Sequence, residues 1–306
     1  MSASAFTIFI SLSLIWGFTW IAIKFGLDTT PPLFFAGTRF VTAGLILAVV
    51  ARRRFVFVDI KAKWKEFLVV ALLITTLCYG PIFWGMQFTS SGIAAVINLS
   101  LIPLLLFALG MAFGTDTFDW GKGVGLALGI VGLAVLFWPE LQAGTMVGGA
   151  GVAALVFGTS AYCLGSVLSG KWLTSFHPTV LSSVVMSVGG LAIFIWSLVV
   201  EPVSLATFGM FLDPKALISW LFLVIAGSAI ALTMYLELLR RWGPTRAGLY
   251  AFVSPIVALV TGALVLGERL EWIQLVGVVL LVSAAALVMG RGGKGNRPPP
   301  NKKALE

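Results

Sequence analysis

The sequence contains few charged residues, one histidine and two cysteines, and each shortage argues against a class of protein. Charged residues make up 10% of the 306 positions, against roughly 25% in soluble globular domains. His177 has no acidic residue beside it, which argues against histidine catalysis or zinc binding. Cys78 and Cys163 both lie inside apolar segments, where we expect packing residues and neither a disulfide nor a metal site.

Motifs that carry enzymatic or nucleotide chemistry are also missing. The sequence has no H-E-x-x-H, no nucleophile elbow, no paired aspartates within an apolar segment and no P-loop. We therefore expect no enzymatic activity, no cofactor, no metal and no direct use of ATP. A membrane-embedded enzyme is the less favoured alternative, together with a channel or an interaction scaffold.

Apolar residues, by contrast, are abundant. Hydrophobic residues make up 59% of the chain, and the mean hydropathy is +1.05. They form long continuous runs without the alternation of β-strands, and helices satisfy their own backbone hydrogen bonds in lipid. The sequence therefore predicts an all-α polytopic membrane protein with ten transmembrane helices, at 5–23, 33–51, 67–86, 92–113, 122–138, 151–170, 179–199, 216–239, 247–266 and 271–290.

The last third of the chain has an earlier copy of itself. A shift of 152 positions places Pro255 on Pro103 and Glu268 on Asp116 without a gap. An internal repeat in an apolar chain is typical of transporters built from two related halves. Because five helices in each half give the halves opposite orientations in the membrane, we expect two inverted repeats around a central cavity.

Basic residues predict the orientation and the boundaries of the halves. The net charge is +8, and sixteen of the twenty lysines and arginines fall in alternate loops and in the tail. Basic loops remain cytoplasmic, which predicts a multi-pass protein of the bacterial inner (plasma) membrane with both termini in the cytoplasm. Its expected partners are a small-molecule substrate and membrane lipids, and no nucleic acid. The predicted domains are a first repeat at 1–140, an external linker at 141–149, a second repeat at 150–290 and a disordered basic tail at 291–306.

Several short motifs follow one another in order along the chain: Trp16-Gly17 and then Lys24, Pro32 with Arg39-Phe40, Ser254-Pro255-Ile256-Val257-Ala258, Leu266-Gly267-Glu268-Arg269-Leu270, and Gly277. Their order and spacing resemble the EamA-type drug/metabolite transporter (DMT) superfamily over nearly the whole chain. The resemblance implies a ten-helix inverted repeat with a central cavity and the export of small metabolites. Within that superfamily the chain is most similar to the YddG-type exporters of aromatic and other neutral amino acids. The turn at Asp116 departs from the Leu-Gly-Glu pattern of the second half.

We therefore expect a secondary membrane transporter that exports small metabolites by alternating access and works as a monomer. Aromatic and other neutral amino acids are the favoured substrates, because an apolar body needs apolar and aromatic walls and its charges need a few polar groups. Export of other apolar or cationic drugs or metabolites is the alternative. The sequence leaves open the exact substrate, the physiological direction, and the choice between proton antiport and facilitated diffusion.

Aromatic and polar residues at mid-depth in the predicted helices are the candidates for substrate binding. A hydroxyl group in lipid is costly without a partner, so the tyrosines are expected to face the cavity, with contact to another helix as the alternative. These candidates are Trp16, Trp20, Tyr79, Asn98, Tyr162, Tyr235 and Tyr250.

Three charged residues within the apolar segments are candidates for gating or charge handling. Lys24 and Arg39 lie near the outer ends of the first two helices. They either bind a substrate carboxylate or extend to the interface and pair with Asp28 in a gate. Glu237 either couples transport to an ion or pairs with the two arginines that end its segment.

Three prolines interrupt predicted helices. Pro81 follows a glycine, and Pro103 and Pro255 occupy equivalent positions in the two halves. A proline inside a helix frees a carbonyl about one turn earlier, here near Leu99 and Ala251. Such a carbonyl either accepts a hydrogen bond from a substrate ammonium group or accompanies a kink that shapes packing.

Overall fold

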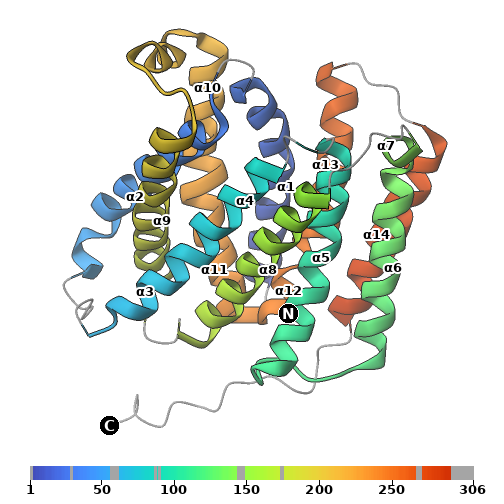
Figure 1. Ribbon diagram of the computed structural model, residues 1–306. Coiled ribbons are helices and arrows are strands. Elements are labelled where there is room, and N and C mark those ends of the chain that lie inside the picture. Colours follow the sequence, from blue (N-terminus) through green and yellow to red (C-terminus); the bar gives the residue numbers. More distant parts are fainter. Residues whose placement is uncertain are drawn as a thin grey trace, which may run out of the picture.

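The computed structural model of the protein describes residues 3–27, 30–55, 62–85, 88, 91–142, 149–172, 176–266 and 271–290. Within these residues the chain is helical and contains no strand (Figure 1). Seven of the described helical stretches are long and apolar enough to cross a membrane, and two shorter apolar helices accompany them. The seven are Ser4–Leu27, Pro32–Arg54, Trp64–Gly85, Gly149–Trp172, Pro178–Val200, Pro214–Trp242 and Trp272–Gly290, and the shorter two are Ile97–Ala112 and Trp120–Leu136.

The helices follow the predicted segments to within a few residues, with one difference in the first half. The predicted fifth helix ends at Trp138, whereas the observed helix ends at Leu136 and a separate short helix follows. The first half contains α1 (Ala3–Leu27), α2 (Pro32–Phe55), α3 (Trp64–Ala71), η1 (Leu72–Thr76), α4 (Leu77–Gly85), α5 (Ser91–Ala112), α6 (Trp120–Leu136) and α7 (Trp138–Gln142).

Among the described residues, the second half has a similar order of elements but adds the 3₁₀ segment η4 and the short helix α12, and it has no counterpart of α7. Most of the predicted linker, at 143–148, and the whole predicted tail lie outside the described residues. The elements are α8 (Gly149–Trp172), α9 (Pro178–Val200), η4 (Leu205–Leu212), α10 (Pro214–Phe222), η5 (Leu223–Ile230), α11 (Ala231–Trp242), α12 (Pro244–Ala247), α13 (Tyr250–Leu266) and α14 (Trp272–Gly290).

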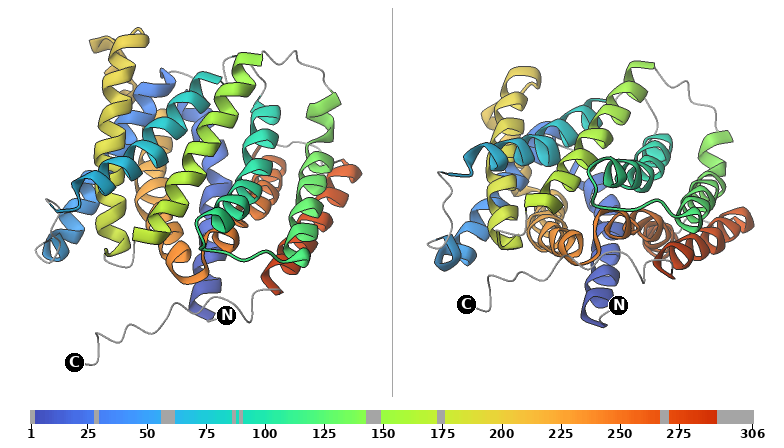
Figure 2. Two further views of the ribbon diagram at one scale, coloured as in Figure 1. Left: turned by 60° about the horizontal axis from the view of Figure 1, so that its bottom comes forward. Right: turned by 90° about the horizontal axis from the view of Figure 1, so that it is seen from below.

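The helices of the two halves are interleaved. Helix α2 packs along α9, and α6 packs along α14. These two pairs lie on opposite sides of the molecule, with the remaining helices between them (Figures 1 and 2). Helix α1 packs against α11 and α13 of the second half, while α8 packs against α4 and α5 of the first. The halves therefore share one interior.

Glycines allow the two outer pairs to approach closely. A Cβ atom on Gly44 of α2 would lie 2.5 Å from the backbone nitrogen of Ser187 in α9, and one on Gly277 of α14 would lie 2.6 Å from the nitrogen of Leu136 in α6. The Ser183 hydroxyl also donates a 2.9 Å hydrogen bond to the Gly44 carbonyl. Such small-residue contacts are the usual basis of helix association in lipid.

Two of the long helical stretches contain a π-helical segment at corresponding places in the two halves. Between α3 and α4, the Leu77 N–H bonds the carbonyl of Leu72, five residues earlier. Between α10 and α11, the Ala231 N–H bonds the carbonyl of Ala226 in the same way. An α-helix reaches back only four residues, and π segments are frequent at functional sites. Both π segments are therefore candidate functional sites.

The three prolines lie inside helices, as the sequence indicates. Pro81 is in α4, Pro103 in α5 and Pro255 in α13. The carbonyl of Ile102, next to Pro103, accepts a 3.7 Å hydrogen bond from the thiol of Cys163 in α8. This contact links α5 to α8, while the role of the carbonyls freed by the prolines stays a prediction.

Candidate functional site

A cavity of about 140 Å³ lies between helices from both halves of the chain. At about 30 Å³ for each water molecule in the liquid, the cavity has room for about five waters or for a small metabolite of similar size. Its walls come from α1, α2, α4, α5, α8, η5 and α13. The lining residues are Trp16, Thr19, Ile23, Arg39, Cys78, Tyr79, Ile82, Phe83, Asn98, Leu99, Ile102, Leu155, Tyr162, Gly227, Tyr250 and Ser254.

Aromatic side chains form much of this lining. The Trp16 and Tyr250 ring centroids are 4.3 Å apart in an edge-on contact, and the Tyr250 hydroxyl donates a 3.1 Å hydrogen bond to that of Tyr162. The indole N–H of Trp16 donates to the carbonyl of Gly227 in η5 at 3.2 Å. The π segment η5 thus helps to position the Trp16 ring, and Tyr79 lines the cavity from α4.

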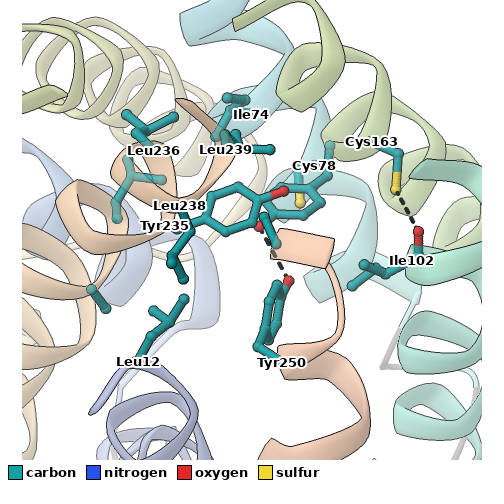
Figure 3. Close-up of a cluster of buried hydrophobic side chains, with 14 of the residues drawn as sticks. Leu12, Ile74, Cys78, Ile102, Cys163, Tyr235, Leu236, Leu238, Leu239 and Tyr250 are labelled. Atoms are coloured by element: carbon teal, nitrogen blue, oxygen red, sulfur yellow. Dashed lines mark hydrogen bonds between the residues drawn. The ribbon is translucent and has the colours of Figure 1, made fainter. Parts of the chain in front are cut away.

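Tyr235 occupies a different place from the other three tyrosines. It is fully buried and does not line the cavity. Its ring centroid lies 5.6 Å from those of both Tyr162 and Tyr250, and all three belong to one buried cluster. Figure 3 shows Tyr235 and Tyr250 within this cluster. Tyr235 therefore lies behind the wall, where it supports the lining rings, and its part in substrate binding stays a prediction.

Asn98 supplies a polar group to the cavity, and its orientation follows from its neighbours. The Thr159 hydroxyl of α8 donates to the Leu155 carbonyl at 2.7 Å, so it accepts the 3.1 Å hydrogen bond from Asn98 Nδ2. Among the described residues, no group donates to the Oδ1 atom of Asn98. That oxygen is therefore available to a ligand.

Arg39 of α2 is the cation among the lining residues that the structure describes. Only 4% of the residue is exposed, so the interfacial alternative does not fit it. The guanidinium carbon lies 4.3 Å from the Phe40 ring centroid and 5.6 Å from that of Tyr79, which are cation–π distances. The Nε and Nη1 atoms are buried without a hydrogen-bond partner among the described residues. Asp28 and the side chains of Trp20 and Lys24 lie outside what the structure describes.

Sequence reasoning missed several lining residues. Thr19, Cys78, Gly227 and Ser254 all contribute to the cavity wall. The Thr19 hydroxyl donates to the carbonyl of Trp16, three residues earlier, as hydroxyls do throughout membrane helices. No local signal separates a residue that lines a cavity from one that merely bonds its own helix.

Residues 3–138 and 149–290 match the model of the EamA-like transporter family. The chain belongs to this family. The two matched segments contain every described helix except α7, of which they include only Trp138. The EamA-like assignment agrees with the expectation of a non-enzymatic membrane protein.

Relatives of this EamA-like chain extend over almost its whole length. The uncharacterized inner membrane transporter YedA of Escherichia coli (strain K12) is 30% identical over 285 residues, which cover 91% of this chain and 88% of YedA. The uncharacterized transporter YvbV of Bacillus subtilis (strain 168) is 26% identical over 277 residues, covering 90% and 88%. A solved crystal structure with 16% identity matches with a TM-score of 0.79 over 94% of this chain and 96% of its own. This last likeness concerns the fold alone.

Glu237 lies away from the cavity in this EamA-like fold. It forms ion pairs with Arg240, at 2.6 Å, and with Arg241. A second contact of Arg241, to the hydroxyl of Ser4, connects this cluster to the start of α1. The structure therefore shows the ion-pair alternative for Glu237, and we infer that it stabilises the end of α11.

Two further polar contacts join α2 to the ends of α9. The Glu201 carboxylate accepts hydrogen bonds from the Leu33 and Phe34 N–H groups at 2.7 and 2.8 Å. Partial burial raises the pKa of Glu201, while the two N–H donors act in the opposite direction. At the other end, Nη1 of Arg54 lies 2.9 Å from Nδ1 of His177. Burial is the main cause that lowers the pKa of His177, and the positive charge of Arg54 is the next. Both ends of the α2–α9 pair are thus tied by side chains.

Proposed function

We propose that the protein is a secondary transporter that exports small metabolites by alternating access, with aromatic and other neutral amino acids as its substrate class. One observation carries this proposal: a cavity whose walls come from both halves of the chain. In transporters built from repeats, substrates bind between the repeats and the halves move about that site. Membership of a transporter family supports the same conclusion.

The helix contacts support two five-helix repeats of opposite orientation, which we propose for residues 1–140 and 150–290. Helices α2 and α9 pair with each other, and so do α6 and α14. The contacts of α1 with α11 and α13 become those of α8 with α4 and α5 when the halves are exchanged. The family match also falls on two segments, one in each half. Such a relation lets the two halves exchange conformations between the inward- and outward-open states.

The chemistry of the cavity supports amino acids with apolar side chains. Trp16, Tyr79, Tyr162 and Tyr250 offer aromatic surface to an apolar body, and the Oδ1 atom of Asn98 offers an acceptor to an ammonium group. Few polar groups among mostly apolar walls are typical of sites for small molecules. The resemblance to YddG-type exporters favours the same substrate class, with other apolar or cationic metabolites as the alternative.

Counterflow in proteoliposomes tests the proposed function. Vesicles loaded with one unlabelled aromatic or branched amino acid should take up its labelled form in a saturable manner. No pH gradient should be needed, because the described lining residues include no carboxylate to carry a proton. Empty vesicles are the control. Absence of counterflow across a panel of neutral amino acids would contradict the substrate class. Strict dependence on a pH gradient would contradict the prediction that transport needs no proton gradient.

We also propose that both termini are cytoplasmic. The basic end of α2 supports this orientation, because the last turn of the helix contains Arg52, Arg53 and Arg54. A cysteine introduced at Ser204, in the loop after α9, should react with an impermeant maleimide applied outside intact cells, whereas one at Ala62 should react only after lysis. Cys78 and Cys163 are both buried, so we expect the wild-type protein to remain unlabelled and to serve as the background control. The reverse pattern of labelling would overturn the topology.

A further inference from the structure

Among the residues that the structure describes, the charge of Arg39 has no counterpart in the cavity. The described lining residues include no aspartate and no glutamate, and no described residue forms an ion pair with Arg39. The rings of Phe40 and Tyr79 attract the guanidinium by cation–π contacts, but they do not replace hydrogen-bond acceptors for its N–H groups. A buried guanidinium with unsatisfied donors is costly unless a ligand supplies the missing acceptor.

We propose that Arg39 binds the carboxylate of the substrate, so that the cavity selects small aromatic monocarboxylates and does not require an α-ammonium group. This proposal rests on the proposed function and names the carboxylate as the group of the substrate that the cavity recognises. The planar guanidinium presents N–H groups in a fork that matches the two oxygens of a carboxylate. The aromatic rings beside it then contact the apolar body of the ligand.

The other end of an amino acid finds a weaker partner. Asn98 Oδ1 accepts a hydrogen bond without carrying charge, so an ammonium group gains a contact there but no ion pair. A monoanion neutralises Arg39, a zwitterion leaves one net positive charge in the cavity, and a cationic amine adds a second. The expected order of affinity is therefore a monocarboxylate at least equal to the zwitterion, and both far above the amine.

Three ligands with the same phenyl group separate these cases. We would measure the binding of 3-phenylpropanoate, L-phenylalanine and 2-phenylethylamine to the purified full-length protein by calorimetry. The two carboxylates should bind with dissociation constants within about tenfold of each other, and the amine should bind at least about a hundredfold more weakly. Acetate carries the carboxylate without the ring and should bind at least about tenfold more weakly than 3-phenylpropanoate. Equal binding of acetate would instead indicate a simple anion site.

Variants of Arg39 test the assignment directly. Arg39→Gln removes the charge and should weaken 3-phenylpropanoate binding by about a hundredfold, while Arg39→Lys keeps the charge, loses the fork and should weaken it by about tenfold. Arg53→Gln, on the exposed face of the same helix, should leave binding unchanged. The ligand-free melting temperature of Arg39→Gln should change little, because the buried Nε and Nη1 atoms have no hydrogen-bond partner among the described residues and removal of a buried charge offsets the lost cation–π contacts with Phe40 and Tyr79. If the role of Arg39 were only structural, the melting temperature of Arg39→Gln should fall clearly.

Several outcomes would overturn the inference. They are tighter binding of the amine than of the carboxylates, no binding of 3-phenylpropanoate to the wild type, and unchanged binding in Arg39→Gln. The binding of the three phenyl ligands to the wild type tests the inference even if a variant fails to fold. If the ligands bind in the expected order but none shows counterflow, the proposed transport function is contradicted and the role of Arg39 is not. Counterflow of phenylalanine that persists unchanged in Arg39→Gln would contradict the role of Arg39 alone.

Discussion

Proteoliposomes that contain the Asn98→Ala variant should need a ten- to hundredfold higher substrate concentration for half-maximal counterflow than the wild type. The substitution removes the Oδ1 acceptor and the hydrogen bond from Nδ2 to Thr159. Loss of a hydrogen bond to a charged group costs about 1.5–3 kcal/mol, which corresponds to this range of affinity. The measurement is the rate of counterflow as a function of substrate concentration, normalised to folded protein.

The control for Asn98→Ala is Gln274→Ala. Gln274 is also a buried amide, but it accepts from the Glu271 N–H at the start of α14 and lies outside the cavity. Its removal should lower stability and leave the half-saturating concentration unchanged. If Asn98→Ala and Tyr250→Ala both transport normally, the substrate does not contact this side of the cavity, and the side that contains Arg39 becomes the better candidate.

Gly44→Leu should destabilise the protein by about 3 kcal/mol, as expected for strong overpacking of a helix contact. The first added carbon would already lie 2.5 Å from the Ser187 nitrogen and 2.9 Å from the Ser183 carbonyl oxygen. Backbone atoms cannot rotate away as a flexible side chain does, so α2 and α9 must separate. Unfolding in detergent, followed by temperature or denaturant, measures the loss.

Gly123→Leu is the matched substitution. A Cβ atom on Gly123 of α6 would have no atom within 4 Å, so the added side chain should change the free energy of unfolding by less than about 0.5 kcal/mol. Similar destabilisation by the two leucines would show that the α2–α9 contact does not set the effect.

Composition and periodicity predict the helices well, because membrane helices must satisfy their own backbone and must exceed a minimum length. The long runs of apolar residues therefore gave boundaries within a few residues. The π segments were not predicted, because nothing in the apolar run Leu72–Thr76 distinguishes it from an ordinary helical turn.

The candidate site was predicted in part. Trp16, Tyr79, Asn98, Tyr162 and Tyr250 all line the cavity, since polar and aromatic groups at mid-depth need an environment other than lipid. The inward position of Arg39 did not follow from its place in α2, because its burial depends on neighbours in other helices. Tyr235, like the other tyrosines, carries a hydroxyl group within an apolar segment, so the sequence does not distinguish it from them. Only the packing of α11 places it behind the cavity wall.

The π segment between α3 and α4 has a consequence for mutations that change the length of the chain. An α-helix advances about 100° for each residue, and the π segment absorbs extra chain within a continuous helical stretch. A π turn holds about one residue more than an α turn, so a deletion of one residue from Leu72–Thr76 that restored an ordinary α-helix would keep Tyr79 facing the cavity. A deletion of one residue from α8 ahead of Tyr162, where the helix is α-helical throughout, would instead turn Tyr162 by about 100° away from the cavity. Single deletions in Leu72–Thr76 should therefore be less harmful than single deletions in α8.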